Sequence, residues 1–336
     1  MKAVFFKEDR RVTVCEVPEP KIETPDEVLV KIKAAGLCGS DLHLLREATT
    51  GEFIQGHEGA GVVVEVGSNV RALKPGDRVS LYHKTGCGEC AYCRTGFISM
   101  CRGGKAQAMH RDGVDAEYYV ADKKYMLKLP EALSFYDGSM IACGAGTAYS
   151  AVSKMALSAA ETLVVFGLGP LGLATVKIAK AYGARVIGVD VKPDRLAMAQ
   201  RVGIDQDIDG SHEDVIETVA VLEPFGVRHV IDVSGNPQAR ATAVQLVAPN
   251  GTVAFVGMRN HLNTIFDIDN MIRKQVTIFG SYVYPLTLWD DMRDFFLRNN
   301  VRFDDLVTHT YRLDDAARAF EEFEAGMARK AFFVME

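Results

Sequence analysis

Hydrophobic runs are short throughout this 336-residue sequence, and acidic residues outnumber basic ones to give a formal net charge of −6. No uninterrupted apolar stretch approaches the roughly 18 residues that a membrane helix needs. The start, MKAVFFKEDRRVTV, breaks its apolar run with charges, so it is not typical of a secretion signal and indicates a first β-strand. The acidic balance argues against nucleic-acid or membrane partners, which would require a basic surface. We therefore expect a cytoplasmic protein.

Cysteines are not scarce, and most of them gather in TGCGECAYCRTGFISMC. Four of the seven lie there, at Cys87, Cys90, Cys93 and Cys101. In a reducing compartment such a cluster is more typical of metal binding than of disulfides. The short returns let several sulfurs face one centre, and four thiolates describe a closed structural zinc site. We expect this cluster to support a loop and not to catalyse.

The pattern of predicted secondary structure changes near residue 145. Before it, short β-like runs such as VLVKIKAAG and GAGVVVEVG alternate with glycine and proline, which predicts a mostly β domain. After it, buried strands alternate with helical segments, which predicts a parallel sheet covered on both faces. The tail carries two helical segments, the first with the only tryptophan, Trp289, as a packing residue, and ends in the strand-like KAFFVM. There is no internal repeat or low-complexity tract.

A GxGxxG made by Gly167, Gly169 and Gly172 stands between a predicted strand and a predicted helix. In this context the first glycine makes the turn, the second admits a pyrophosphate, and the third lets helix and strand pack closely. Pro170 suits the first position of the helix. Asp190 ends the next strand, where its charge would bind ribose hydroxyls and repel a 2′-phosphate, so we expect NAD and not NADP. The further expected cofactor contacts are Leu171, Arg195, Ser234 and Val256.

Three candidate ligands outside the cysteine cluster predict a second metal site. Cys38 lies in AGLCGSDLH, His57 in IQGHEGAG and Cys143 in MIACGAGTAY. Two sulfurs and an imidazole leave one tetrahedral position open for water or substrate, which is the arrangement of a catalytic zinc. Alone, each residue has an ordinary explanation as a buried or surface side chain, but together beside a dinucleotide fold they indicate a site.

At this point the sequence resembles the zinc-dependent medium-chain alcohol dehydrogenases. GHEGAGVVVEVGSNV fits the family's GHE pattern, the cysteine cluster is similar to its structural-zinc lobe, and VVFGLGPLGLATVKIAKAYGARVIGVD is similar to its cofactor fingerprint. The resemblance covers essentially the whole chain. It implies a GroES-like catalytic domain of residues 1–145 and 281–336, split by a Rossmann domain of residues 146–280 that binds NAD.

The resemblance also implies roles for single residues. Glu58 matches an acid that can approach the catalytic zinc, Thr147 matches a threonine near the nicotinamide, and Ser40 and His43 match the hydroxyl and imidazole of a proton relay. Zinc would bind the alcohol and lower its pKa, the proton would leave through the relay, and the alkoxide would give hydride to NAD. Asp41 would orient His57, unless it is a plain turn residue.

Substrate identity is less well determined. The segment LLREATTGEF is short and lacks tryptophan, and His83 falls where relatives place a pocket residue, although a surface histidine is an equal alternative. We expect a secondary alcohol or polyol, with a primary or aromatic alcohol, or threonine, as alternatives. A zinc-free quinone reductase and a non-catalytic nucleotide-binding relative are the competing functions. The resemblance also favours a homo-oligomer, a tetramer or a dimer.

Overall fold

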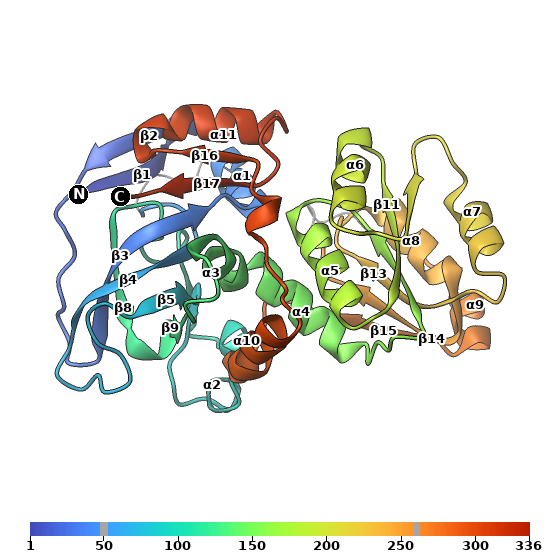
Figure 1. The fold of residues 1–336 in the computed structure, drawn as a ribbon, viewed down its shortest axis with the longest axis horizontal. Helices are drawn as coiled ribbons and strands as arrows, with labels where there is room; N and C mark the ends of the chain where they lie inside the picture. The colour runs from blue at the N-terminus through green and yellow to red at the C-terminus, as the bar shows by residue number, and fades with distance from the viewer. Residues whose placement is uncertain (48–52, 259–262) are drawn as a thin grey trace. The chain divides into compact units, whose positions relative to one another are not determined.

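The computed structural model describes residues 1–47, 53–258 and 263–336, which form two compact units (Figure 1). Unit 1 comprises Met1–Gly146 and Pro285–Glu336, and unit 2 comprises Thr147–Tyr284. The second boundary lies four residues beyond the predicted 280/281. The chain stays with unit 2 after its last strand because the Ser281 backbone N–H donates to the Phe255 carbonyl at 2.9 Å, which prolongs the strand pairing.

Unit 1 is built mainly of β-strands, as predicted. A hairpin pairs β1 with β2, and a larger sheet has the order β16-β17-β3-β4-β5-β9, with β8 on β3. A small two-stranded sheet pairs β6 with β7. The strand bounds are β1 Lys2–Lys7, β2 Arg11–Glu16, β3 Glu27–Gly36, β4 Glu58–Val66, β5 Arg78–Leu81, β6 Lys84–Thr85, β7 Lys105–Ala106, β8 Tyr118–Asp122, β9 Met126–Lys128, β16 His309–Tyr311 and β17 Ala331–Val334.

Along residues 27–34 of β3 every second residue is buried, which is the period of a strand with one face on the core, and the last three residues of the strand are all buried. Its neighbours are β4, β8 and β17, all antiparallel. The tail therefore folds back onto the first domain, as the sequence predicts, and Figure 1 shows the red β17 beside the blue β3. Val28, Val30 and Ile32 of β3 are fully buried in the core.

The helices of unit 1 are short. Trp289, the single tryptophan, begins α10 and is buried, so its predicted packing role is confirmed. The bounds are α1 Gly39–Arg46, α2 Ala91–Arg94, α3 Phe135–Ala142, α10 Trp289–Arg298 and α11 Ala316–Glu324, with 3-10 turns at Glu8–Arg10, Ile98–Met100, Lys123–Tyr125, Leu286–Leu288, Asp304–Leu306 and Leu313–Asp315. Helix α4 (Gly144–Lys154) begins in unit 1 and continues in unit 2.

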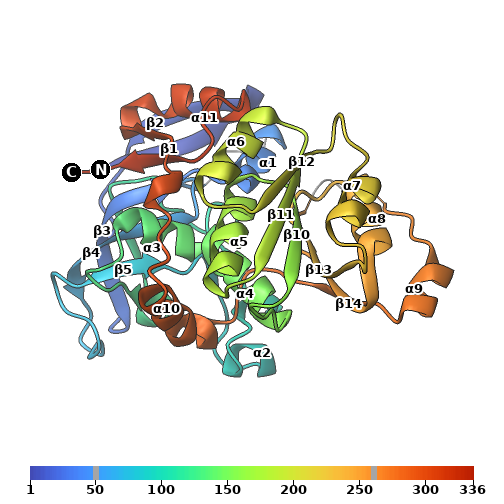
Figure 2. The same ribbon diagram turned by 45° about the vertical axis from the view of Figure 1, so that its right-hand side comes forward.

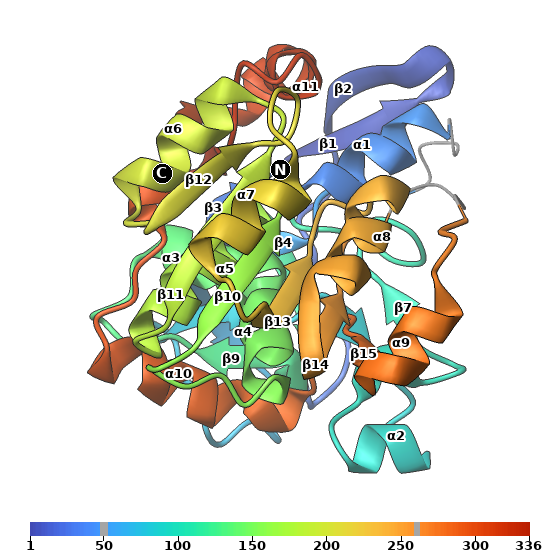
Figure 3. The same cartoon turned by 90° about the vertical axis from the view of Figure 1, so that its right-hand side faces the viewer.

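Unit 2 contains a six-stranded parallel sheet in the order β12-β11-β10-β13-β14-β15 (Figure 3). Numbered within the unit, this order is 3-2-1-4-5-6, the doubly wound order of dinucleotide-binding folds. The strands are β10 Thr162–Phe166, β11 Arg185–Asp190, β12 Gln206–Asp209, β13 Val227–Asp232, β14 Val247–Phe255 and β15 Thr277–Gly280. The strands are added outward in one direction from β10 to β12 and in the opposite direction from β13 to β15, so a crevice is expected at the carboxyl ends of β10 and β13.

Helices cover both faces of this sheet, and apolar side chains of its central strands β10, β11 and β13 are buried. Figures 1 and 2 show α5 and α6 on one face and α8 and α9 on the other. The bounds are α5 Pro170–Ala181, α6 Pro193–Arg201, α7 Val215–Leu222, α8 Pro237–Leu246 and α9 Ile268–Lys274. Within the described ranges, no helix combines the length and apolar character that crossing a bilayer would require.

Candidate active site

The residues predicted to bind the catalytic metal converge in unit 1. The Cys38 and Cys143 sulfurs, a His57 ring nitrogen and a Glu58 carboxylate oxygen lie within 4.8 Å of one another. Each comes from the end of an element: Cys38 caps α1, His57 precedes β4, and Cys143 lies between α3 and α4. Such ends leave the backbone free to turn a side chain inward, and soft sulfur with imidazole is a donor set that suits zinc. The residues present therefore fit a zinc ion.

Asp41 connects two of these candidate ligands. One of its carboxylate oxygens lies 2.8 Å from His57 Nδ1, and the other accepts a 2.8 Å hydrogen bond from the Cys38 backbone N–H. The predicted contact of Asp41 with His57 is thus confirmed. A carboxylate on Nδ1 leaves Nε2 for a metal. Burial alone would lower the pKa of His57, but Asp41 and Cys38 outweigh it and raise the pKa well above its usual value.

Ser40 lies beside the converging donor atoms. Its hydroxyl donates to Cys38 Sγ at 3.2 Å and lies 3.3 Å from His57 Nε2. The serine is exposed, so it connects the cluster with the surface. His43 is partly exposed and lies one turn further along α1. Residues 48–52 of the substrate-related segment LLREATTGEF lie outside the described residues.

Glu58 has a partner that the sequence reasoning missed, the buried Lys330. Burial raises the pKa of Glu58 to about 8 although Lys330 opposes that change. Glu58 and Cys38 in turn keep the pKa of Lys330 above its usual value despite burial. A dication at the cluster would favour the ionised carboxylate. No local pattern marks Lys330, because its partner is 272 positions away in the chain.

His83 is buried and belongs to this region. Its Nδ1 donates to the Ala142 carbonyl at 2.7 Å, next to Cys143, and its ring centre lies 5.3 Å from that of His57. The surface alternative for His83 is therefore wrong, since it is only 5 % exposed. Burial lowers the pKa of His83 to about 3, so the ring is neutral. A neutral ring that donates through Nδ1 offers Nε2 as an acceptor.

Asp115 is a second buried group near the cluster that the sequence analysis missed. Its side chain packs against Gly56, where an added Cβ would lie 2.1 Å from a carboxylate oxygen. Neither carboxylate oxygen has a hydrogen-bond partner among the described residues. Burial and the nearby Asp41 charge raise the pKa of Asp115 well above its usual value.

The four clustered cysteines also converge. Their sulfurs lie within 4.8 Å of one another, and all seven cysteines of the chain are free thiols. Backbone N–H groups of Cys87, Cys90 and Cys93 point at neighbouring sulfurs at 3.4–3.5 Å, and such bonds favour thiolates. The Glu89 and Cys90 N–H groups lower the pKa of Cys87 to about 6. This donor set fits a closed tetrahedral metal site.

The tight loop around these sulfurs requires a glycine at position 86. A Cβ at Gly86 would lie 2.5 Å from Cys93 Sγ, so a larger residue would enter the space of the cluster. The Tyr125 hydroxyl accepts from the Gly86 N–H at 2.8 Å and donates to its carbonyl at 3.1 Å. The base of the loop is closed by the β6–β7 pairing.

In unit 2 the glycine turn joins β10 to α5, as predicted. Gly167 has φ +93°, and an added Cβ at Gly172 would lie 1.9 Å from the Gly167 carbonyl oxygen. Gly169 differs from both, because a Cβ there would meet no atom within 4 Å. The turn thus presents backbone to open space at the start of a helix that begins with Pro170. These residues fit a dinucleotide whose pyrophosphate approaches Gly169.

Asp190 ends β11 and binds the same turn. Its carboxylate accepts hydrogen bonds from Leu168 N (2.7 Å), Val191 N (2.8 Å), Lys192 N (3.0 Å) and Arg195 Nη1 (3.3 Å). The four bonds use both oxygens. What Asp190 offers a cofactor is therefore its charge, which the adjacent Arg195 partly offsets.

The remaining predicted cofactor residues lie at or near strand and helix ends of unit 2. Ser234 follows β13 and packs on Gly167, while its hydroxyl donates to Asp232, a buried residue that the prediction omitted. The other predicted residues are Val256, which follows β14, Leu171 in the first turn of α5, and Thr147 in α4. Asp232 stabilises the loop after β13, because its carboxylate also accepts hydrogen bonds from the Ser234 and Gly235 backbone N–H groups.

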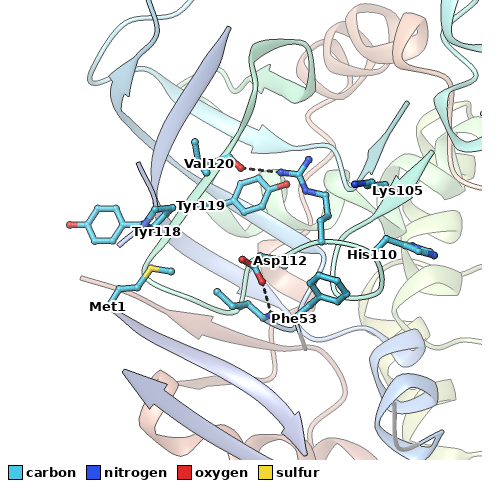
Figure 4. A pocket seen from close by; sticks show the side chains of 12 residues that line it. Met1, Phe53, Lys105, His110, Asp112, Tyr118, Tyr119 and Val120 are labelled. Carbon is cyan, nitrogen blue, oxygen red and sulfur yellow. Dashed lines mark hydrogen bonds between the residues drawn. The ribbon is translucent and has the colours of Figure 1, made fainter. Parts of the chain in front are cut away.

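Unit 1 also has a cavity of about 380 Å³ beside the N-terminus. Met1, Phe53, Lys105, His110 and Tyr118 are among its lining residues (Figure 4). None of the described residues around it belongs to the predicted site.

A Rossmann-ordered sheet and a separate β-rich unit with a Cys/His cluster form the combination found in metal-dependent dehydrogenases. Comparison with known families agrees with this class. Residues 24–131 match the alcohol dehydrogenase GroES-like domain, and residues 170–298 match the zinc-binding dehydrogenase domain.

Individual relatives span nearly the whole chain. The uncharacterized zinc-type alcohol dehydrogenase-like protein YphC of Escherichia coli (strain K12) is 37 % identical over 98 % of this chain and 97 % of its own. The "Probable D-xylulose reductase A" of Aspergillus clavatus is 32 % identical over 93 % of this chain and 90 % of its own. The chain therefore belongs to the zinc-binding alcohol dehydrogenase family, whose members are oxidoreductases that act on CH–OH groups.

Solved structures are similar over the full length. The alcohol dehydrogenase TADH from Thermus sp. ATN1 is 28 % identical with a TM-score of 0.95, covering 100 % of both chains. The galactitol-1-phosphate dehydrogenase of Escherichia coli is 28 % identical with a TM-score of 0.90, also covering 100 % of both. The predicted fold class, a GroES-like catalytic domain with a Rossmann domain, is confirmed.

Proposed function

We propose that this protein is an NAD-dependent dehydrogenase that reversibly oxidises a secondary alcohol or polyol to the ketone. The observation that carries the proposal is the convergence of the Cys38, His57, Glu58 and Cys143 donor atoms within 4.8 Å, with the Ser40 hydroxyl beside them. Unit 1 is the catalytic domain in this proposal, and unit 2 is the NAD-binding domain.

Two zinc ions per chain complete the protein. One is held by Cys38, His57 and Cys143, with Glu58 close by, and the other by the four clustered cysteines. Zinc at the first site supplies a Lewis acid that lowers the pKa of a bound hydroxyl. Asp41 keeps the His57 ring oriented for this ligation, and the four-cysteine site, closed by its own sulfurs, stabilises its loop.

The alcohol proton leaves through Ser40. The serine hydroxyl is exposed and adjacent to the donor atoms, so it can accept a proton on the substrate side and pass one to the solvent side. His43 follows on the same helix as the group that exchanges the proton with water. NAD bound by unit 2 would supply the nicotinamide that accepts the hydride from the alcohol carbon.

His83 supports a substrate with more than one hydroxyl. Its neutral ring offers Nε2 as a hydrogen-bond acceptor near the metal cluster, which suits a second hydroxyl better than an alkyl chain. Two of the relatives are named for polyhydroxylated compounds, the ketose D-xylulose and the polyol phosphate galactitol 1-phosphate. We therefore assign His83 a role in selecting substrates that carry a second hydroxyl.

The test measures NAD reduction with primary alcohols, simple secondary alcohols, polyols and threonine, using the wild type, His83→Asn and His83→Phe. The asparagine amide can still donate to the Ala142 carbonyl but has no counterpart of the His83 Nε2 acceptor. Phenylalanine removes both the donor and the acceptor. We expect kcat/KM for polyols to fall about tenfold in both variants, the worth of one lost hydrogen bond, with simple secondary alcohols little changed. A wild type that prefers primary alcohols or threonine would contradict the proposed substrate class.

The protein acts in the cytoplasm as a homo-oligomer, a dimer or tetramer, in the same proposal. Strand β15 is the last strand of the unit 2 sheet, and the nearby Ile265, Ile268 and Ile272 are more than half exposed. An edge strand with adjacent apolar side chains can pair with a second copy. Sedimentation or light scattering of the purified protein measures the assembly.

A further inference from the structure

Arg240 is a partly buried arginine in the first turn of α8, the helix that packs against β13 and β14 (Figure 3). Its guanidinium group has partners at the ends of both strands. Nε donates to a carboxylate oxygen of Asp232, the last residue of β13, at 3.3 Å, and Nη2 donates to the Gly257 carbonyl beyond β14 at 2.5 Å. The planar fork of an arginine suits a bridge between two acceptors.

Asp232 provides a fixed end for this bridge. Its side chain is fully buried, and its carboxylate also accepts hydrogen bonds from the Ser234 N–H at 3.0 Å and the Gly235 N–H at 3.1 Å. Burial raises the pKa of Asp232, and these hydrogen bonds together with the charge of Arg240 oppose that rise. A buried carboxylate requires such partners, so Arg240 is part of the support of the loop that follows β13.

The two loops that Arg240 joins are also in contact through their backbones. The Val256 and Gly257 N–H groups both donate to the Asp232 carbonyl, at 2.9 Å and 3.1 Å. An added Cβ at Gly257 would lie 2.3 Å from the Gly235 backbone nitrogen, so any larger residue at this position would force the loops apart. The close approach places the Gly257 carbonyl within reach of the guanidinium group.

These loops follow the first two strands of the second half of the sheet. In a dinucleotide-binding fold each half binds one mononucleotide, and the cofactor lies across the carboxyl ends of the strands. The glycine turn after β10 and Asp190 at the end of β11 belong to the first half, which receives the adenosine. The loops that Arg240 joins belong to the half that receives the nicotinamide, and they carry Ser234 and Val256, two of the expected cofactor contacts.

We propose that Arg240 is a positioning residue that holds the loops after β13 and β14 in the arrangement that the nicotinamide half of NAD requires, an inference that rests on the NAD-binding role of unit 2 in the proposed function. Within the described residues, the side-chain hydrogen bonds of Arg240 go to Asp232 and Gly257. Neither partner belongs to the half that receives the adenosine. Loss of Arg240 should therefore weaken binding of a nicotinamide-containing ligand and leave binding of an adenosine ligand unchanged.

The test compares NADH with AMP, because AMP contains only the adenosine half of the cofactor. Dissociation constants for both are measured by calorimetry with the wild type, Arg240→Met and Arg240→Lys. Arg240→Met should weaken NADH binding by about tenfold or more and keep AMP binding within about twofold of the wild type. Arg240→Lys keeps the charge beside Asp232 but lacks the fork that reaches both partners, so it should weaken NADH binding by about threefold.

Unchanged NADH affinity in Arg240→Met would overturn the proposal, as would equal weakening of NADH and AMP binding, which a general loss of structure would produce. If Arg240→Met does not fold, Arg240→Lys decides by the same comparison. Arg185→Met is the matched control and should bind both ligands like the wild type. Arg185 also pairs with a carboxylate, that of Glu223 at 2.8 Å, but it begins β11 and so lies at the amino ends of the strands.

The wild type separates this inference from its premise. A wild type that does not bind NADH would refute the NAD dependence of the proposed function itself. A wild type that binds NADH, with an Arg240→Met variant that binds both ligands equally well, would remove only the role of Arg240.

Discussion

At the scale of single residues, Asp190 can influence cofactor choice through its charge, although both of its carboxylate oxygens already accept hydrogen bonds from the chain. Four donors from the chain already bind its two oxygens, and Asp190 is only 6 % exposed. A ribose hydroxyl would have to share an occupied oxygen. Discrimination against a 2′-phosphate then depends on electrostatic repulsion, which acts over several ångströms and needs no free lone pair.

Replacing Asp190 with asparagine removes this charge and keeps an acceptor for the backbone N–H groups. We expect the ratio of kcat/KM for NADP to that for NAD to rise by roughly tenfold or more, equivalent to about 1.4 kcal/mol. Steady-state kinetics with both cofactors measures the ratio. An unchanged ratio would show that Arg195 already cancels the charge.

His229 is a buried titratable group away from the metal clusters. It lies within β13, is 3 % exposed, and has Nε2 3.2 Å from a Glu161 carboxylate oxygen. Burial lowers the pKa of His229 below its usual 6.5, although Glu161 acts in the opposite direction. The unfolded chain therefore takes up this proton first as the pH falls, and the folded state loses stability below about pH 6.5.

The prediction is that His229→Gln loses less free energy of unfolding than the wild type between pH 7 and pH 5. The difference in slope is at most about 1.4 kcal/mol per pH unit, the value for one proton. Denaturant unfolding at a series of pH values measures it. His212→Gln, at an exposed position, is the matched control and should follow the wild type. Parallel curves for His229→Gln and the wild type would contradict the assignment.

At the scale of elements, two glycines in the turn from β10 into α5 have different roles. A Cβ at Gly172 would collide with backbone, the Gly167 carbonyl oxygen at 1.9 Å, whereas a Cβ at Gly169 would meet nothing within 4 Å. Gly169 also has an ordinary φ of −71°, which alanine adopts readily. One glycine serves the packing of strand against helix, and the other keeps space for a ligand.

Two alanine variants should therefore fail in different ways. Gly172→Ala should lower the free energy of unfolding by roughly 2–4 kcal/mol, because α5 must move away from the turn. Gly169→Ala should change stability by no more than about 0.5 kcal/mol and raise the KM for NAD about tenfold or more. Thermal unfolding and cofactor titration distinguish the two. Equal losses of stability would contradict this division of roles.

At the scale of the whole molecule, both cysteine-bearing clusters lie in unit 1 and serve different purposes. We expect close to two zinc ions per chain by metal analysis. Cys38→Ser should lower the content to one ion and abolish alcohol oxidation, with little loss of stability. Cys90→Ser should also remove one ion, but with a clear fall in melting temperature, because bare thiolates cannot hold the loop of residues 86–104. A wild type with one ion that survives Cys38→Ser would refute the catalytic site.

Elements and local motifs follow from the sequence itself. Alternation along β3, the apolar runs of β10 and β13, the glycine turn and the four close cysteines are all local patterns, set by side-chain period and backbone freedom within a few residues. The candidate ligands Cys38, His57 and Cys143 were recognisable by type and by resemblance. Their convergence was predicted from residue type and resemblance, and no local pattern gives it, because it depends on which ends of strands and helices become neighbours.

Only the tertiary structure placed Lys330 against Glu58, left the Asp115 carboxyl without a hydrogen-bond partner in the part of the chain that the structure describes, buried His83 beside His57, and saturated Asp190 with hydrogen bonds. Some of these features are contacts between residues far apart in the chain. Others depend on how many hydrogen-bond partners surround a single group. Nothing in residue order records them, because they arise when strands and turns pack and exclude water, around β3, β4 and β17 in unit 1 and around β10 and β11 in unit 2. The sequence by itself therefore determined which chemistry is present, and the packing decided which groups carry a charge, lack a partner or remain free to bind.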